Sequence, residues 1–125
     1  LHWLGRLSDA DKTARLRGAD VFCAPSLRGE SFGVVLIEAM AAGTAIVASG
    51  LDGYRNVATN DVDALLVEPG DTERLAQTLR RALGDAQLRG RLVAAGQRRA
   101  EDFSMDTLAD LYAERYHRLA GRPAV

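Results

Sequence analysis

The stretch of sequence that decides the fold spans residues 28–43 and reads RGESFGVVLIEAMAAG. Between residues 34 and 42 every side chain except Glu38 is apolar. We therefore predict a helix over residues 31–42 that is apolar on all sides and lies centrally in the fold. Gly43 is a natural end for this helix, because glycine readily adopts the left-handed conformation that follows many helices.

Glu38 is the exception in this helix. A carboxylate in an apolar setting costs free energy unless hydrogen-bond donors reach it. The donors are either groups of the protein, such as a backbone amide or an arginine, or the hydroxyls of a ligand. The helix alone favours neither alternative.

The loop before the helix has the features of a phosphate site. Gly29 and Gly33 let the backbone approach a ligand closely. The first amides of the predicted helix, at residues 32–34, lack partners within the helix and attract anions. Glu38 lies roughly 8–9 Å further along the helix axis, where the ribose of a bound nucleoside diphosphate would reach. Glu30, on the other side of the amides, is either a solvated loop residue or a contact to sugar hydroxyls.

Outside this stretch, short apolar runs alternate with helical patterns, which predicts an α/β, Rossmann-like parallel sheet with helices on both faces. We expect strands over residues 1–4, 20–24, 44–49 and 64–67. Helices are expected over residues 9–17, with Ser8 or Asp9 as the cap, and after caps at Asp71, Asp85 and Ser104. Ligands bind at the carboxyl ends of parallel strands, so any site is expected in the loops over residues 5–9, 25–31 and 50–54.

The last predicted helix carries apolar residues at helical spacing, among them Leu108, Leu111, Tyr112 and Leu119. Two alternatives stay open for this apolar stripe. If it is exposed, the chain will tend to self-associate. Otherwise the stripe packs on the sheet of this domain.

Composition limits the classes of function. The chain has 125 residues, of which 47% are hydrophobic and 26% charged, as expected for one globular domain. With 16 basic and 17 acidic residues, no overall field recruits nucleic acid or a membrane, so local geometry must hold any anionic ligand. No signal peptide and no membrane-spanning stretch is apparent, and the start at Leu1 suggests a missing upstream portion.

Glu30 and Glu38, eight residues apart, resemble the paired-glutamate motif of group 1 retaining glycosyltransferases with the GT-B fold. The likeness continues through residues 39–49 and covers nearly the whole chain. Within that family, the chain is most similar to bacterial phosphatidylinositol mannosyltransferases, which use GDP-mannose. The resemblance implies that residues 1–120 are the C-terminal, donor-binding domain of a two-domain enzyme, incomplete at its N-terminus, and that residues 121–125 are a frayed tail.

The resemblance also implies roles for the residues of the motif. Glu30 is the catalytic residue and contacts hydroxyls of the donor sugar. Glu38 binds the ribose hydroxyls, and Leu36 packs nearby. The backbone between them holds the sugar and the diphosphate through Ser31, Phe32, Gly33 and Val34.

Base recognition is implied for the loop after Gly5. Leu7 meets the base through its backbone, Asp9 accepts the N–H groups of guanine, and Lys12 lies close by. A carboxylate that accepts two donors suits guanine, because uracil offers no such pair. From the sequence alone Asp9 serves equally well as the cap of the helix over residues 9–17, and the two roles are compatible.

The implied activity is transfer of mannose from GDP-mannose to a phosphatidylinositol-type lipid, with retention of the anomeric configuration. The lipid acceptor would bind through the missing N-terminal domain, so we expect a cytoplasmic protein that associates peripherally with the inner face of the cell membrane. We expect no cofactor, no metal and no nucleic-acid partner, and we expect the isolated domain to be inactive. The alternatives are a transferase for another nucleotide sugar or acceptor, and a nucleotide-sugar-binding module without activity.

Two further signals are interpreted as structural. The acidic triplet Asp-Val-Asp at residues 61–63 resembles the metal-binding triplet of other glycosyltransferases. It lies in the turn before a predicted strand, however, rather than after a nucleotide-binding strand. The arginine pairs at residues 80–81 and 98–99 are interpreted as solvated helix faces.

Overall fold

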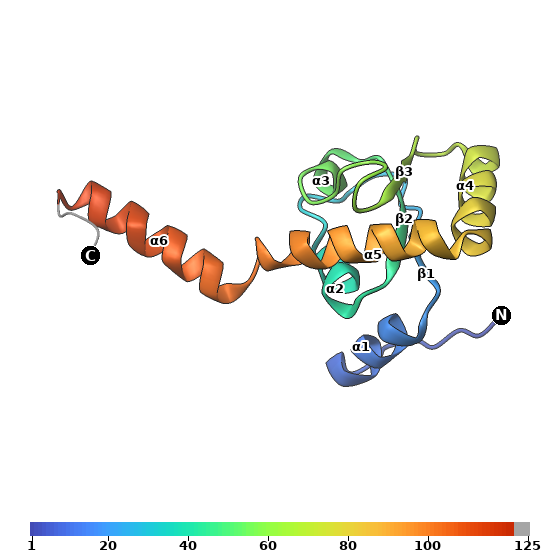
Figure 1. Cartoon of the computed structure of the whole chain (residues 1–125), viewed down its shortest axis with the longest axis horizontal. Coiled ribbons are helices and arrows are strands. Elements are labelled where there is room, and N and C mark those ends of the chain that lie inside the picture. The colour runs from blue at the N-terminus through green and yellow to red at the C-terminus, as the bar shows by residue number, and fades with distance from the viewer. Residues whose placement is uncertain (122–125) are drawn as a thin grey trace.

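The computed structural model describes residues 1–121, apart from the side chains of Leu108 and Leu111. All of the predicted tail except Gly121 therefore lies outside the described residues. The elements follow one another as α1 (Asp9–Gly18), β1 (Val21–Ala24), α2 (Val34–Ala42), β2 (Ala45–Ser49), α3 (Asp52–Arg55), β3 (Leu65–Val67), α4 (Thr72–Gly84), α5 (Ala86–Glu101) and α6 (Met105–Leu119) (Figure 1).

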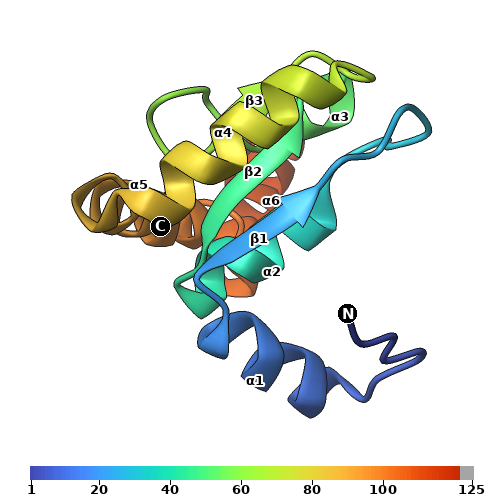
Figure 2. The same ribbon diagram turned by 90° about the vertical axis from the view of Figure 1, so that its right-hand side faces the viewer.

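The three strands form one parallel sheet in the order β1-β2-β3, which confirms the predicted α/β class (Figure 2). The strand predicted over residues 1–4 is wrong, because this segment has no regular structure. Leu1 and Trp3 are 104% and 90% exposed. A strand needs a neighbour to satisfy its backbone hydrogen bonds, and no described segment pairs with residues 1–4.

Helices cover both faces of the sheet, as predicted. All five residues of β2 are buried, and the three central ones alternate between two hydrophobic cores. Ile46 and Ala48 belong to the core that contains side chains of α1 and α2. Val47 belongs to the other core, with side chains of β3, α4 and the first half of α5. Near its other end, Ala100 of α5 packs against the first core, so α5 contributes to both.

Side-chain caps begin four of the helices. The predicted caps at Asp71, Asp85 and Ser104 are confirmed, since each side chain accepts a hydrogen bond from an amide in the first turn of its helix. Helix α1 is capped by Ser8, whose hydroxyl accepts from the Asp11 amide at 3.1 Å. Asp9 is therefore not the cap, which leaves its carboxylate available for another role.

Helix α2 begins at Val34 and not at residue 31. The reason is Gly33, whose φ of +83° is incompatible with a right-handed helix. The helix is also less central than predicted: Leu36 and Met40 are buried, but Val34 is 56% exposed. It packs against α1, α5 and β2, and it ends as predicted at Gly43, with φ +78°.

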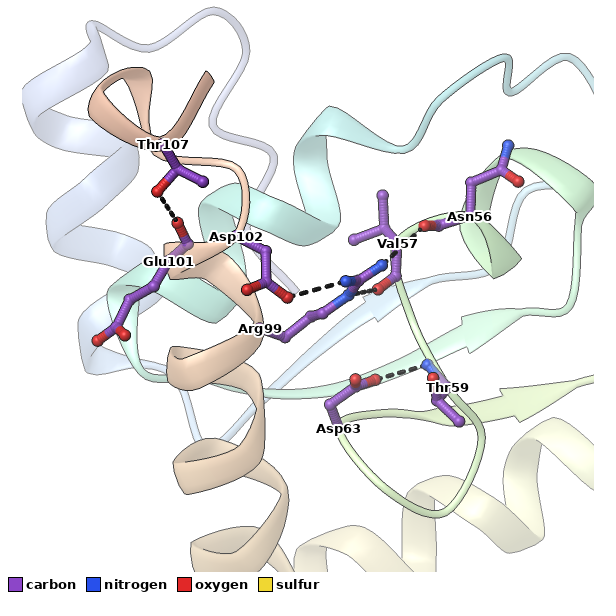
Figure 3. Close-up of polar contacts among 8 residues, drawn as sticks. All are labelled: Asn56, Val57, Thr59, Asp63, Arg99, Glu101, Asp102 and Thr107. Carbon is purple, nitrogen blue, oxygen red and sulfur yellow. Dashed lines mark hydrogen bonds and ion pairs between the residues drawn. The ribbon is translucent and has the colours of Figure 1, made fainter. Parts of the chain in front are cut away.

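Arg99 is not part of a solvated face, contrary to the prediction for residues 98–99. Its guanidinium donates to the carbonyls of Val57 at 2.8 Å and Asn56 at 3.1 Å, and it pairs with Asp102 at 2.9 Å (Figure 3). It also lies 4.6 Å from the centre of the Phe103 ring. Arg99 thus joins the end of α5 to the segment that follows α3.

The acidic triplet has structural contacts. Asp63 is 5% exposed, accepts a hydrogen bond from the Thr59 amide at 2.7 Å (Figure 3), and has its pKa raised by burial. Asp61 has a positive φ of 61° and lies 3.6 Å from Arg81. The two carboxylates thus stabilise the turn before β3.

Helix α6 projects from the end of α5, away from the sheet (Figure 1). Its exposed apolar side chains lie at spacings of seven, four and three residues and so share one side of the helix: Met105, Tyr112, Tyr116 and Leu119, each between 72% and 84% exposed. The alternative that this stripe packs on the sheet is therefore wrong for Tyr112 and Leu119. Among the described residues, no helix combines the length and apolarity needed to cross a membrane.

We expect this chain by itself to self-associate through the exposed stripe of α6, because burying apolar surface is favourable. Light scattering should give an average mass that rises with concentration. Replacing Tyr116 and Leu119 by lysine should suppress the rise. Asp110→Lys raises the net charge by the same two units at an exposed position on the opposite side of α6, and it should leave the rise in mass unchanged. A concentration-independent monomer mass for the unmodified chain would contradict this expectation.

Candidate functional site

A pocket of about 420 Å³ lies between α1, the loop after β1 and the start of α2. Its walls contain seven of the ten predicted site residues together with Val35, namely Lys12, Glu30, Ser31, Phe32, Gly33, Val34, Val35 and Glu38. The pocket therefore brings Lys12 of α1 together with the end of the loop and the first turns of α2, which begin about twenty residues later in the sequence. This is the edge of the sheet at which ligands were expected.

Residues 31–35 line the pocket, and their backbone amides have no hydrogen-bond partner within the described residues. Those of Val34 and Val35 open α2, whereas the Leu36 amide already donates to the Gly33 carbonyl. Glu38 follows Val34 by four residues, roughly 6 Å along the helix axis. The anion site at residues 32–34 and the ribose site at Glu38 stay predictions.

Glu38 has a partner within the protein, and that partner is Lys12. The Lys12 Nζ atom donates to Glu38 Oε1 at 3.2 Å and lies 3.7 Å from Asp9 Oδ1. The side chains of Lys12 and Glu38 are 42% and 36% exposed, so solvent screens this ion pair. Glu38 Oε2 has no hydrogen-bond partner among the described residues, so the carboxylate can hold Lys12 and a ligand hydroxyl together.

Glu30 is half-buried and also lines the pocket, and its carboxylate has no hydrogen-bond partner within the described part of the chain. The pocket thus contains two carboxylates and one ammonium group. An anionic ligand would depend on the amides and the dipole of α2 for attraction. Arg6 and Arg28 do not line the pocket.

Three predicted site residues lie outside the pocket walls. Leu36 is fully buried in the hydrophobic core and does not line the pocket, and its predicted packing near the ribose stays a prediction. Leu7 is half-buried and Asp9 is fully exposed, and both lie at the entry to α1. Only Asp9 is connected to the pocket, through Lys12. The base-binding roles of Leu7 and Asp9 stay predictions.

One contact of the loop after β1, between Ser26 and Tyr54 of α3, was not predicted from the sequence. Tyr54 is 2% exposed, and its hydroxyl lies 3.2 Å from the Ser26 hydroxyl. Helix α3, to which Tyr54 belongs, was expected to be a loop. The available signal was a single aromatic residue in the polar segment over residues 50–56, which is too little to predict a buried contact.

Known proteins resemble this chain in sequence and in structure. The family described as "Glycosyl transferases group 1" matches residues 1–99. A phosphatidyl-myo-inositol mannosyltransferase from Mycobacterium leprae is 43% identical over 120 residues, which is 96% of this chain and 32% of the relative. A D-inositol 3-phosphate glycosyltransferase from Salinispora tropica is 39% identical over 108 residues, which is 83% of this chain and 22% of the relative.

Among solved structures, Anabaena HepE in complex with UDP-glucose matches with a TM-score of 0.75 and 26% identity. The match covers 83% of this chain and 29% of that one. The chain spans about a third or less of each of these relatives. The family match nevertheless extends over most of the chain and includes every residue of the pocket. The chain therefore belongs to the group 1 family of glycosyl transferases.

Proposed function

We propose that this chain is the donor-binding domain of an enzyme that transfers mannose from GDP-mannose to a phosphatidylinositol-type lipid, with retention of the anomeric configuration. The observation that carries the proposal is the pair of unpaired amides at the start of α2, which lies between Glu30 and Glu38 in one pocket. The mannosyltransferase from Mycobacterium leprae and the inositol-phosphate glycosyltransferase from Salinispora tropica support a glycosyl transfer to an inositol-containing acceptor.

The donor would lie along the pocket in one direction. Its diphosphate would accept hydrogen bonds from the Val34 and Val35 amides, where the helix dipole favours negative charge. Its ribose would donate to Glu38, and its sugar would donate to Glu30 at the other end. This order uses both carboxylates of the pocket and the amides at the start of α2, and it leaves Lys12 between the ribose and the base.

The base would lie at the entry to α1, beside Asp9. Because Ser8 caps α1, the Asp9 carboxylate is free of that role and can accept the two N–H groups of guanine. The HepE structure holds UDP-glucose, so a uridine donor is the alternative for this site. Uracil presents no pair of donors that matches a carboxylate.

The chemistry in this pocket would be positioning and charge stabilisation. The acceptor hydroxyl would attack the anomeric carbon on the face from which GDP leaves, and an oxygen of the departing diphosphate would take the hydroxyl proton. The amides of α2 would stabilise the negative charge that develops on the diphosphate. Neither a metal nor a cofactor has a place in this scheme. The remaining cations and the lipid-binding surface would come from the rest of the protein, which would act peripherally at the cytoplasmic face of a membrane. A donor-binding module without activity is the alternative.

The first prediction is a preference for guanine. At matched concentrations GDP should raise the melting temperature more than UDP or ADP. At ten times its Kd, GDP should add about 1.4 kcal/mol to the free energy of unfolding. Asp9→Ala should remove the difference between GDP and UDP without uncapping α1. Equal shifts for the three nucleotides in the unmodified chain would refute the base assignment and leave the fold untouched.

The second prediction separates the two glutamates in the full-length protein. Glu38→Ala should weaken binding of free GDP at least tenfold, since a charge-assisted hydrogen bond is worth about 1.5–3 kcal/mol. Glu30→Ala should lower sugar transfer and leave the Kd for GDP nearly unchanged, because GDP lacks the sugar. Calorimetry with GDP and a transfer assay with GDP-mannose measure the two effects. The opposite pattern would mean that the donor lies in the reverse direction.

A further inference from the structure

The loop that carries Glu30, over residues 25–32, has few attachments of its own. Within the described residues its backbone makes no hydrogen bond. Its one polar tether is the contact between the hydroxyls of Ser26 and Tyr54 at 3.2 Å. The Phe32 ring makes an edge-to-face contact with Phe103, with ring centres 5.9 Å apart. Such a loop takes its position from whatever packs directly beneath it.

The first turn of α3 fills that position. A methyl group built on Gly53 would overlap the carbonyl oxygen of Glu30, and it would come within 2.7 Å of the carbonyl carbon of Glu30 and 3.0 Å of that of Ser31. The backbone of Glu30 and Ser31 therefore rests directly on the Cα atom of Gly53. Gly53 does not have a positive φ, so space and not conformation requires glycine here.

The other end of the same loop rests on the neighbouring residue. A methyl group built on Gly33 would lie 3.0 Å from Cδ1 of Tyr54 and 3.2 Å from the carbonyl oxygen of Gly53. The segment over residues 30–33 thus contacts Gly53 at both ends and Tyr54 at Gly33.

Hydrogen bonds and burial of Tyr54 fix the position of helix α3. The amides of Val57 and Ala58 donate to the Tyr54 carbonyl at 3.1 and 2.8 Å. Arg99 of α5 donates to the carbonyls of Asn56 and Val57 (Figure 3). The Tyr54 side chain is buried in the core. Residues 53 and 54 therefore form a fixed platform, and the loop above them is the part that can shift.

We propose that Gly53 and Tyr54 are positioning residues for Glu30, which set where its carboxylate stands in the pocket. The proposal rests on the role of Glu30 at the donor sugar that is proposed above. Glu38, Lys12 and Asp9 lie on α1 and on the second turn of α2, beyond Gly33, where the segment contacts the platform. A change at residue 53 or 54 should therefore affect the sugar end of the donor far more than the nucleotide end.

The test uses Gly53→Ala and Tyr54→Phe in the full-length protein, with Gly90→Ala as the matched control because a methyl group there meets nothing within 4 Å. Gly53→Ala should lower kcat/KM for GDP-mannose by about 100-fold, as expected for a displacement of about 1 Å at a reacting site. Tyr54→Phe keeps the ring and loses one hydrogen bond, so its loss should be about fivefold. The Kd for GDP should change less than twofold in both.

A double-mutant cycle identifies Glu30 as the group through which the platform acts. Adding Gly53→Ala to Glu30→Ala should cause little further loss of transfer, because the carboxylate that it displaces is already absent. Losses that multiply would overturn the inference. So would a parallel fall in GDP affinity, or a Tyr54→Phe variant with unchanged kcat/KM.

Limited proteolysis separates failure of the inference from failure of the proposed function. Trypsin should cleave after Arg28, an exposed residue of the loop, faster in both variants than in the unmodified protein, with cleavage in α4 unchanged. An unchanged rate of cleavage at Arg28 would overturn the positioning role whatever Glu30 does. Faster cleavage at Arg28, combined with full transfer activity of Glu30→Ala, would refute instead the proposed role of Glu30 at the sugar.

Discussion

The left-handed backbone of Gly33 is the constraint on which the site depends. Its φ of +83° ends the loop and lets α2 begin at Val34, which places the amides of Val34 and Val35 at the pocket. Any other residue would be strained in this conformation, and its Cβ atom would also press on Tyr54. The sharp turn of the chain at this one position allows the loop residue Glu30 and the helix residue Glu38 to line the same pocket.

The electrostatic character of the pocket follows from the same arrangement. Two carboxylates and one partly exposed lysine leave it without excess positive charge. Because Lys12 is paired with Glu38, backbone dipoles are the main attraction that the described residues of the pocket offer to a diphosphate. This suits a ligand whose hydroxyls donate to carboxylates while its phosphates accept from amides, and it is a poor site for a bare phosphate.

The parts of the fold that local patterns determine could be predicted from the sequence. The buried run of β2 and the caps at Asp71, Asp85 and Ser104 depend on neighbouring residues only. The segment over residues 1–4 has the composition of a strand, but a strand requires a partner that composition cannot supply. The start of α2 was misplaced because the sign of φ at Gly33 is set by packing against α3.

In the site, too, local patterns could be predicted from the sequence, and contacts between distant segments could not. The contiguous motif from Glu30 to Glu38 predicted most of the pocket. The ion pair between Lys12 and Glu38 joins residues 26 positions apart, and the contact between Ser26 and Tyr54 joins residues 28 positions apart. Contacts of this kind depend on how α1 and α3 pack on the rest of the domain, which no local pattern reveals.

The path of α5 has a consequence for how the domain loses its structure. Leu88 and Leu92 belong to the core on one face of the sheet, whereas Ala100 packs against the core on the other face. Detaching α5 would therefore open both layers at once, and neither layer could melt while the other kept its native packing. We expect the described domain to denature in a single cooperative transition, with one midpoint shared by probes of either face.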